Sequence, residues 1–379
     1  MSRIILIPDS FKGTLSSLQI CQIMREEILR QDPTSEVIAI PVADGGEGTV
    51  EAFLTALGGA KKAKTVCGPH FTPVPSFWGK LPDGTAVIEM AAAAGLPLVG
   101  EDKHVETATT FGVGELLRDA LESGCRRILL GLGGSATNDL GCGAACALGA
   151  RFFKADGTSF VPTGGTLCEI DSMDLSSLLP SLSGAEITVM CDIDNPLYGE
   201  EGAAFVFAPQ KGADPAMVRR LDEGLRHGAA VIRRDVGVSV DRLPGGGAAG
   251  GMGAGMSAFL GAKLCPGIAA VLDTVHFDSL LRGAQMVYTG EGRIDSQSLR
   301  GKVVIGVSRR AKKAHVPVTV LVGSIGEGYE DAYEEGVSGI FSINRQPMDF
   351  SQSRFHSEEN LRRTMRDLLL YQKALAACR

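Results

Sequence analysis

Short apolar runs alternate with helical patterns at the start of the chain. Residues 3–8 hold the apolar run I-I-L-I, which is too short for a helix, and residues 16–30 follow with apolar positions at helical spacing. The pattern repeats at once, with a β-rich run over 36–42, a glycine-rich loop over 43–48 and a second helical pattern over 49–57. Strands that alternate with helices are typical of a parallel, doubly wound sheet.

The C-terminal part repeats this alternation. A β-rich run at 285–288 leads into a loop and a helical pattern, and a second run at 317–322 does the same. Residues 339–343 form a final strand, and a helix over about 358–377 closes the chain. We therefore expect the two ends of the chain to join one parallel sheet.

The middle of the chain has a different pattern. Over 64–90, one β run lies around Pro73-Val74-Pro75 and another covers 85–89. Pro82-Asp83-Gly84 joins them with residues typical of a turn. This pattern predicts antiparallel strands, so the sheet type changes within the chain.

The simplest architecture for these patterns is an α/β fold of two domains. A discontinuous Rossmann-like domain with a parallel sheet comprises residues 1–62 and 283–379, and a second, mixed α/β domain over 63–282 is inserted into it. The chain has 379 residues, of which 44% are hydrophobic, so it is long enough for two buried cores.

Charge and hydropathy exclude several classes of partner. The net charge is −7 and the basic residues are dispersed, which argues against nucleic acid or a membrane surface, because both require a basic face. No apolar stretch approaches the roughly 18 residues needed to span a bilayer, and residues 1–11 lack the apolar core of a signal peptide. We expect a cytoplasmic protein. A homo-oligomer is possible, and the sequence does not specify the oligomeric state.

Cysteine and glycine usage point to a small-molecule site. The nine cysteines include no C-x-x-C pair, and Cys142 and Cys146, four residues apart, have no accompanying histidine, so we expect reduced thiols. The 49 glycines cluster at the ends of apolar runs, where positive φ or close approach to a ligand is needed. Loops are therefore expected to build the site.

Seven loops combine glycine with Asp, Glu, Lys, Asn or Ser. They are P-D-S-F-K-G (8–13), A-D-G-G-E-G-T (43–49), G-L-G-G-S-A-T-N-D (131–139), C-D-I-D-N-P (191–196), A-P-Q-K-G (208–212), the run 245–255, and T-G-E-G-R-I-D (289–295). In this order and at this spacing they resemble the bacterial glycerate kinase family, which makes 2-phosphoglycerate. The resemblance extends over about residues 3–343, with a departure at His70-Phe71, where that family usually has Leu-Gly.

The resemblance implies a fold, a reaction and co-substrates. It implies two α/β domains with the active site in the cleft between them, ATP and Mg²⁺ as co-substrates, and D-glycerate as the acceptor. It favours phosphorylation at the 2-position, while 3-phosphoglycerate as the product stays open.

The loop 131–139 is the first candidate for a phosphate site. It follows the β run 127–130 and precedes a pattern of small residues that predicts a helix, so its N–H groups are expected to face an anion. We assign nucleotide binding to Gly133, Gly134 and Ser135 here, to Gly247 and Gly250 in the run 245–255, and to Lys302. No Walker sequence ending in Gly-Lys-Ser/Thr is present.

Acidic residues follow several predicted strands. Asp9 and Lys12 lie beyond the first strand, and Asp44 and Glu47 beyond the second, at the carboxyl edge of a parallel sheet where ligands bind. Asp44 and Glu47, with Asp194, are the predicted Mg²⁺ ligands. Helix capping is the alternative for the aspartates.

Four residues are predicted to be catalytic. Asp192 alternates with Asp194 after a β run and is the predicted acceptor of the hydroxyl proton, although a turn explains Asp194 equally well. Lys211 and Lys12 supply positive charge to a phosphate or a carboxylate. Arg293 suits bidentate recognition, or else a structural salt bridge to Glu291 or Asp295.

Two other functions fit parts of the sequence. The dinucleotide-like glycine loops suggest an NAD-dependent oxidoreductase of a small hydroxy acid, with Asp156 near the place of a ribose-binding acid. A non-catalytic binding protein for a sugar acid is the third reading. Binding of NAD instead of ATP would favour the oxidoreductase. Binding of glycerate without nucleotide turnover would favour the non-catalytic binding protein.

Overall fold

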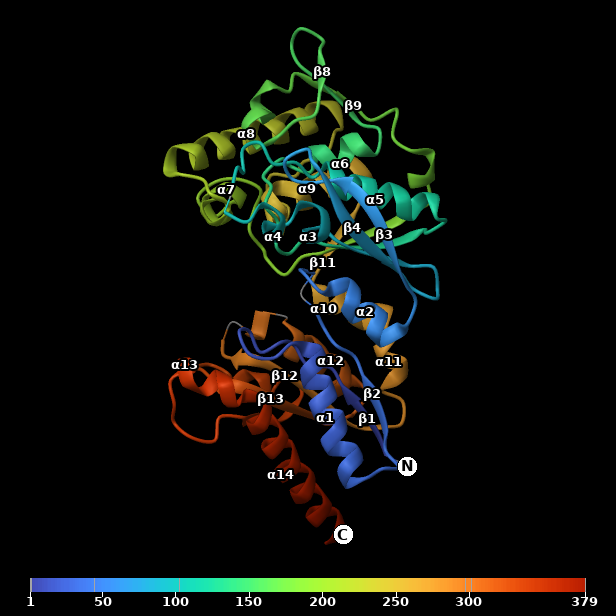
Figure 1. Ribbon diagram of the computed structural model, residues 1–379, viewed down its shortest axis with the longest axis vertical. Helices are drawn as coiled ribbons and strands as arrows, with labels where there is room; N and C mark the ends of the chain where they lie inside the picture. Colours follow the sequence, from blue (N-terminus) through green and yellow to red (C-terminus); the bar gives the residue numbers. More distant parts are fainter. Residues whose placement is uncertain (1, 44, 102, 297, 301, 379) are drawn as a thin grey trace. The chain divides into compact units, whose positions relative to one another are not determined.

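The chain forms two compact units in the computed structural model, which describes residues 2–43, 45–101, 103–296, 298–300 and 302–378. One unit combines Met1–Ala43 with Ile268–Arg379, and the other comprises Asp44–Gly267. Figure 1 labels their elements along the chain. The domain boundaries that the sequence predicts, near residues 62 and 283, stay a prediction.

The first unit contains a five-stranded sheet whose neighbouring strands are all parallel. Its order is β14-β13-β12-β1-β2, so the N-terminal strands extend the sheet in one direction and the C-terminal strands in the other. The reversal falls between β1 and β12. The strands are β1 (Arg3–Leu6), β2 (Glu36–Ala39), β12 (Ala284–Ile294), β13 (Val318–Ile325) and β14 (Val337–Ser342).

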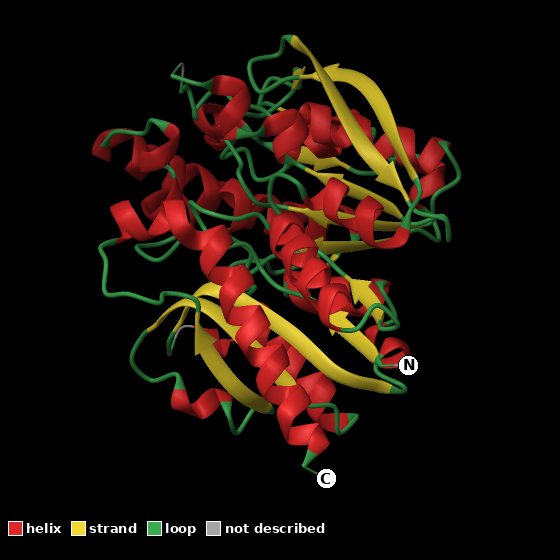
Figure 2. Ribbon diagram, turned by 60° about the horizontal axis from the view of Figure 1, so that its bottom comes forward, coloured by secondary structure: helices red, strands yellow, loops and turns green. Residues whose placement is uncertain are grey.

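Two long helices cover one part of this sheet. Helix α1 begins with a capping box, in which the Ser16 and Gln19 side chains accept each other's backbone N–H groups. Its buried Ile20 and Met24 belong to one apolar cluster with Leu361 and Met365 of α14, which lies across the strands in Figure 2. The helices of the unit are α1 (Ser17–Gln31), α10 (Gly267–Thr274), α11 (Phe277–Leu280), α12 (Val303–Lys313), α13 (Phe350–Ser353) and α14 (Ser357–Ala377).

The second unit contains a mixed six-stranded sheet of order β11-β10-β6-β5-β4-β3. Strands β5, β6, β10 and β11 are parallel, whereas β4 is antiparallel to β3 on one side and to β5 on the other. The turn at Pro82-Asp83-Gly84 joins β4 to β5, so the predicted antiparallel pair is confirmed. The strands are β3 (Ala60–Cys67), β4 (Pro73–Lys80), β5 (Ala86–Glu89), β6 (Arg127–Gly131), β10 (Glu186–Met190) and β11 (Lys263–Cys265). A small antiparallel sheet adds β7 (Arg151–Phe153), β8 (Ser159–Phe160) and β9 (Ser172–Asp174).

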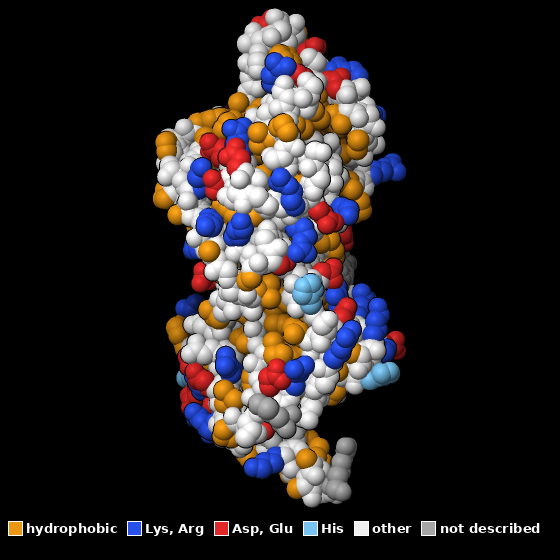
Figure 3. Space-filling view, turned by 90° about the vertical axis from the view of Figure 1, so that its right-hand side faces the viewer, with side chains coloured by type: hydrophobic (Ala, Val, Ile, Leu, Met, Phe, Trp, Pro, Cys, Tyr) orange, Lys and Arg blue, Asp and Glu red, His pale blue; other side chains and the backbone are white. Residues whose placement is uncertain are grey.

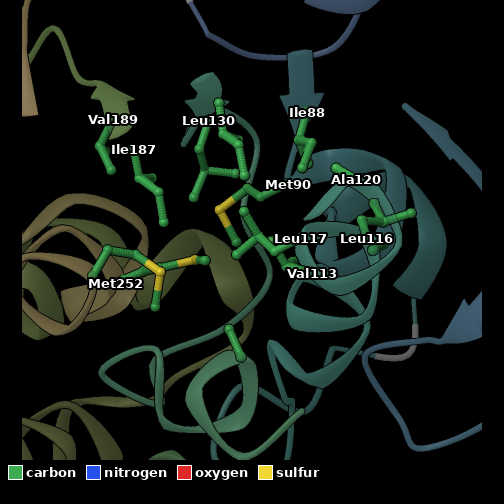
Figure 4. Packing of buried hydrophobic residues seen from close by; sticks show 14 of the residues in the cluster. Ile88, Met90, Val113, Leu116, Leu117, Ala120, Leu130, Ile187, Val189 and Met252 are labelled. Atoms are coloured by element: carbon green, nitrogen blue, oxygen red, sulfur yellow. The ribbon is translucent and has the colours of Figure 1, made fainter. Parts of the chain in front are cut away.

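Helices pack on the parallel strands of this second unit. Figure 4 shows Leu116 and Leu117 packing with Ile88, Leu130 and Met252 in one buried cluster. The helices are α2 (Thr49–Leu57), α3 (Ala91–Ala94), α4 (Leu96–Val99), α5 (Phe111–Glu122), α6 (Cys142–Ala147), α7 (Ala203–Phe207), α8 (Pro215–Asp235) and α9 (Ala248–Leu260).

Helix α2 belongs with the second unit, although the sequence assigns it to the first domain. Its Val50 N–H donates to Glu89 Oε2 at 3.0 Å, and the helix packs on β4 and β5. The carboxylate of Glu89 lies at the end of β5, so it ties the start of α2 to this sheet. The apolar pattern of α2 is that of any amphipathic helix, and it does not specify which sheet the helix covers.

The surface carries both signs of charge. On the face shown in Figure 3, Lys and Arg side chains are interspersed with Asp and Glu. Among the described residues, none of the helices has both the length and the apolar composition required to cross a bilayer.

Candidate active site

The reversal of the first sheet brings two predicted loops together. Asp9, after β1, donates its N–H to Gly290 O of β12 at 2.8 Å. At Gly292, a Cβ atom would lie 3.4 Å from the backbone nitrogen of Lys12, so the loop after β1 runs against β12. In parallel α/β sheets, the carboxyl ends of strands at such a reversal form the usual ligand site.

Glu291 is the buried carboxyl group of this region. It lies in β12 with 6% of its surface exposed, and burial raises the pKa of its carboxyl group to about 7. A hydrogen bond from Ser298 and the charge of Lys302 act in the opposite direction, while the charges of Asp9 and Asp295 raise the pKa further. Oε1 of Glu291 has no hydrogen-bond partner within the described ranges.

Arg293 lies beside Glu291 but faces solvent. Its Nε is 3.1 Å from Asp295 Oδ2, and its side chain is 65% exposed. The predicted strand at 285–288 is wrong in length, because β12 continues to Ile294 and carries Glu291 and Arg293 within the strand. Lys12 and Lys302 are also exposed, and Lys302 immediately precedes α12. Of these basic side chains, Lys302 is the one whose charge acts on the buried carboxyl group of Glu291.

The glycine-rich loop 131–139 follows β6 in the second unit, and a helix of small residues follows the loop, as the sequence predicts. Helix α6 begins only at Cys142 and has six residues. Gly133 donates its N–H to Gly45 O at 3.0 Å and Ala136 donates to Ala94 O at 2.9 Å, so these groups are bonded within the protein. The helix-terminus argument for a phosphate at Gly133, Gly134 and Ser135 therefore fails, and their nucleotide role stays a prediction.

Lys211 is buried beneath this loop, with 2% of its surface exposed. Its Nζ donates to Ser135 Oγ and to Thr137 O, both at 2.7 Å. Burial lowers the pKa of the Lys211 ammonium to about 7, although the charge of Asp139 acts against this shift. A buried lysine whose pKa is shifted in this way is a candidate for binding an anion.

Buried polar groups continue from Lys211 along the loop. The Asp139 carboxylate accepts hydrogen bonds from Thr110, Gly141 and Gly143, and burial raises its pKa. Thr137 Oγ1 and both polar side-chain atoms of Asn138 are buried and have no partner in the described part of the chain. The sequence motif contains these residues, yet nothing in it indicated that their side chains point inward.

Gly247 and Gly250 allow backbones to approach each other. A Cβ atom at Gly247 would lie 2.3 Å from Pro196 O, and one at Gly250, which has φ +66°, would lie 2.2 Å from Thr137 O. The glycines therefore pack the loops 131–139, 191–196 and 245–251 into one cluster, which we call the loop cluster. Ala249, with φ +54°, is strained in the same turn. Contact with a nucleotide stays a prediction for both glycines.

The predicted acidic ligands are mostly at the surface. Asp192 is exposed, and its Oδ1 accepts the N–H of Gly267 at 2.7 Å, at the start of α10. Asp194 and Glu47 are exposed, and Asp44 lies outside the described residues. Among the residues that the structure describes, no group of three or more His, Cys, Asp or Glu could hold a metal ion.

Comparison with known proteins decides the family. The model of the glycerate kinase family matches residues 4–372. The chain belongs to the glycerate kinase family. It is therefore a kinase. The two alternative functions, an NAD-dependent oxidoreductase and a non-catalytic binding protein, do not explain this family match.

Similar proteins match nearly the whole chain. It is 44% identical over 370 residues to a glycerate kinase from Halalkalibacterium halodurans, covering 97% of both chains. It is 45% identical over 343 residues to the glycerate 2-kinase of Escherichia coli, covering 90% of both. A crystal structure of a Salmonella typhimurium LT2 protein assigned as glycerate kinase 2 has a TM-score of 0.88 at 42% identity, covering 99% of each chain.

Proposed function

We propose that this kinase transfers the γ-phosphoryl group of ATP to D-glycerate and produces 2-phosphoglycerate. The observation that carries this proposal is the 45% identity to a glycerate 2-kinase over 90% of both chains. The new bond joins the 2-hydroxyl oxygen to the γ-phosphorus, the bond to the bridging oxygen of ADP breaks, and the hydroxyl proton passes to a carboxylate.

We place the negatively charged ligand groups near the basic side chains described above. Lys211 offers a buried ammonium group to a phosphate or to the glycerate carboxylate, and the unpartnered atoms of Asn138 offer additional hydrogen bonds. Lys12, Arg293 and Lys302 offer exposed positive charge at the reversal of the first sheet. Phosphoryl transfer depends mainly on such positioning and charge neutralisation.

Mg²⁺ is the expected metal, and the acidic residues present are compatible with it. Proteins usually hold Mg²⁺ through one or two carboxylates together with substrate phosphates, so a preformed group of three ligands is not required. Asp44, Glu47 and Asp194 are the proposed carboxylates; the latter two are exposed and accessible. When bound, the metal neutralises charge on the phosphates during transfer.

The reaction is tested by ³¹P NMR of the protein with D-glycerate, ATP and Mg²⁺, with and without EDTA. We expect a phosphomonoester signal that matches 2-phosphoglycerate and is lost on adding EDTA. A signal matching 3-phosphoglycerate would contradict the proposed position. Intact ATP in the presence of D-glycerate and metal would contradict the reaction itself.

A further inference from the structure

Glu291 occupies an unusual place for an acid. It is held in the central strand β12, directly at the reversal of the first sheet, and is 6% exposed. Its neighbour Asp295 is paired with Arg293, whereas Oε1 of Glu291 has no hydrogen-bond partner among the described residues. An unpartnered buried carboxyl oxygen costs stability, so it requires an explanation beyond folding.

We propose that Glu291 is the general base of the reaction and takes the proton of the attacking hydroxyl group. This inference rests on the proposed phosphorylation of glycerate. In the transfer, the hydroxyl oxygen bonds to the γ-phosphorus, ADP leaves with the electrons of the broken P–O bond, and the proton moves to Oε1 of Glu291. No other reactant is required.

The surroundings of Glu291 fit this role. The negative charges of Asp9 and Asp295 raise the pKa of its carboxyl group, and the positive charge of Lys302 and the nearby Ser298 hydroxyl lower it. With burial, these groups bring the pKa of Glu291 to about 7, which is the range in which a base works best near neutral pH. Oε1 of Glu291 is buried and is the carboxyl oxygen that lacks a hydrogen-bond partner among the described residues.

Asp192, the acceptor predicted from the sequence, fits less well. It is exposed, and its Oδ1 already accepts the Gly267 N–H at 2.7 Å. That bond lies at the start of α10, where aspartate commonly serves the helix. The structure therefore gives Asp192 a local structural role at the start of α10. Oε1 of Glu291, by contrast, makes no hydrogen bond among the described residues that would explain its position.

The test measures kcat against pH from 5.5 to 9 for the wild type, Glu291→Gln, Glu291→Asp and Asp192→Asn. We expect wild-type kcat to fall tenfold per unit below pH 7. Glu291→Gln should lower kcat by about 10²- to 10⁴-fold and abolish this fall in kcat at low pH, which we call the acid limb. The KM values for ATP and D-glycerate should change only a few-fold. Glu291→Asp should recover part of kcat, and Asp192→Asn should keep the limb.

Glu27→Gln serves as the matched control. Glu27 is a fully buried glutamate of the same unit, and it pairs with arginines of α1 and α14. Its variant should keep the acid limb even where stability falls. If Glu291→Gln retains the limb, or keeps kcat within tenfold, Glu291 is not the base.

Two further outcomes distinguish a general base at Glu291 from a metal ligand at Glu291 and from a failure of the proposed function. A Glu291→Gln enzyme that regains full kcat at high Mg²⁺ would make Glu291 a metal ligand and overturn its role as base. If the wild type forms no phosphoglycerate from D-glycerate, the proposed function fails first. If it does, and the limb is independent of Glu291, only this inference fails.

Discussion

Lys211 and Glu291 show how burial tunes single side chains in this kinase. Each has lost most of its hydration, and the pKa of each moves toward 7 from opposite directions, because burial disfavours the charged form of both. Near neutral pH each group is therefore divided between charged and neutral forms. Small changes in charge around them, such as the arrival of an anion, will change their protonation.

The low pKa of Lys211 predicts a pH-dependent stability. Its ordinary value is 10.5, so between about pH 7 and 10.5 the unfolded chain binds a proton that the folded chain does not. The folded state therefore gains stability as pH rises through this window, by up to about 1.4 kcal/mol per pH unit. Lys211→Met should lack this contribution, which denaturant unfolding at pH 7, 8 and 9 will measure.

Lys263→Met is the control for this comparison, because Lys263 is exposed and pairs with Glu186 at the surface. Its stability should follow that of the wild type in parallel at all three pH values. A constant difference between the wild type and Lys211→Met would show that Lys211 stays charged in the folded state.

Glu291 predicts the opposite slope. Its pKa rises from the ordinary value of 4.5 to about 7, so the folded chain holds a proton that the unfolded chain has lost. Its contribution to stability is complete below about pH 4.5 and is lost as pH rises through 7. Glu291→Gln should remove this decline, as seen in unfolding curves between pH 5 and 7.5. An unchanged decline in the variant would assign it to other groups.

Among the elements, α9 has the least regular backbone. Ala249, Gly250 and Gly251 adopt left-handed conformations inside it, which lets the turn approach the loop 131–139. Leu140 also has positive φ, and its N–H donates to Gly250 O at 3.1 Å. The loop cluster is thus held by close backbone contacts, in addition to the side-chain hydrogen bonds of Lys211 and Asp139.

Gly250→Ala should destabilise the fold strongly. The added Cβ would lie 2.2 Å from Thr137 O, so either the turn or the loop 131–139 must move. We expect a loss of about 2–4 kcal/mol in the free energy of unfolding and a fall in kcat. Gly157→Ala, also at positive φ but with open space around it, isolates the conformational cost and should lose only about 1 kcal/mol. Equal losses would refute the steric explanation.

Elements with clear local signals could be predicted from the sequence. The I-I-L-I run and the Ser16 cap specify β1 and α1, and the alternation of strands and helices specifies the α/β fold. Other features depend on distant residues. Lys211 looks like a surface lysine because its partners, Ser135 and Thr137, lie more than seventy positions away. The path of the loop 131–139 likewise depends on distant residues, since Gly133 and Ala136 donate their N–H groups to Gly45 O and Ala94 O.

For the whole molecule, ligand binding should discriminate between nucleotides. The family match predicts stabilisation by ATP with Mg²⁺, and none by NAD. At a nucleotide concentration a hundred times its Kd, the gain should be about 2.7 kcal/mol, visible as a raised Tm in a thermal-shift assay. AMP with Mg²⁺ is the control for adenine binding without the terminal phosphates. Stabilisation by NAD alone would contradict the kinase assignment.

The glycine contacts of these loops limit how the loops could be redesigned. Gly131 and Gly133 lie against Gly45 and Gly46, as Gly250 lies against Thr137, so the main chains themselves form the complementary surfaces. A loop transplanted alone from another enzyme would have to reproduce its neighbour's backbone path. Exchanging one of these loops therefore requires the segments that interlock with it to be exchanged together.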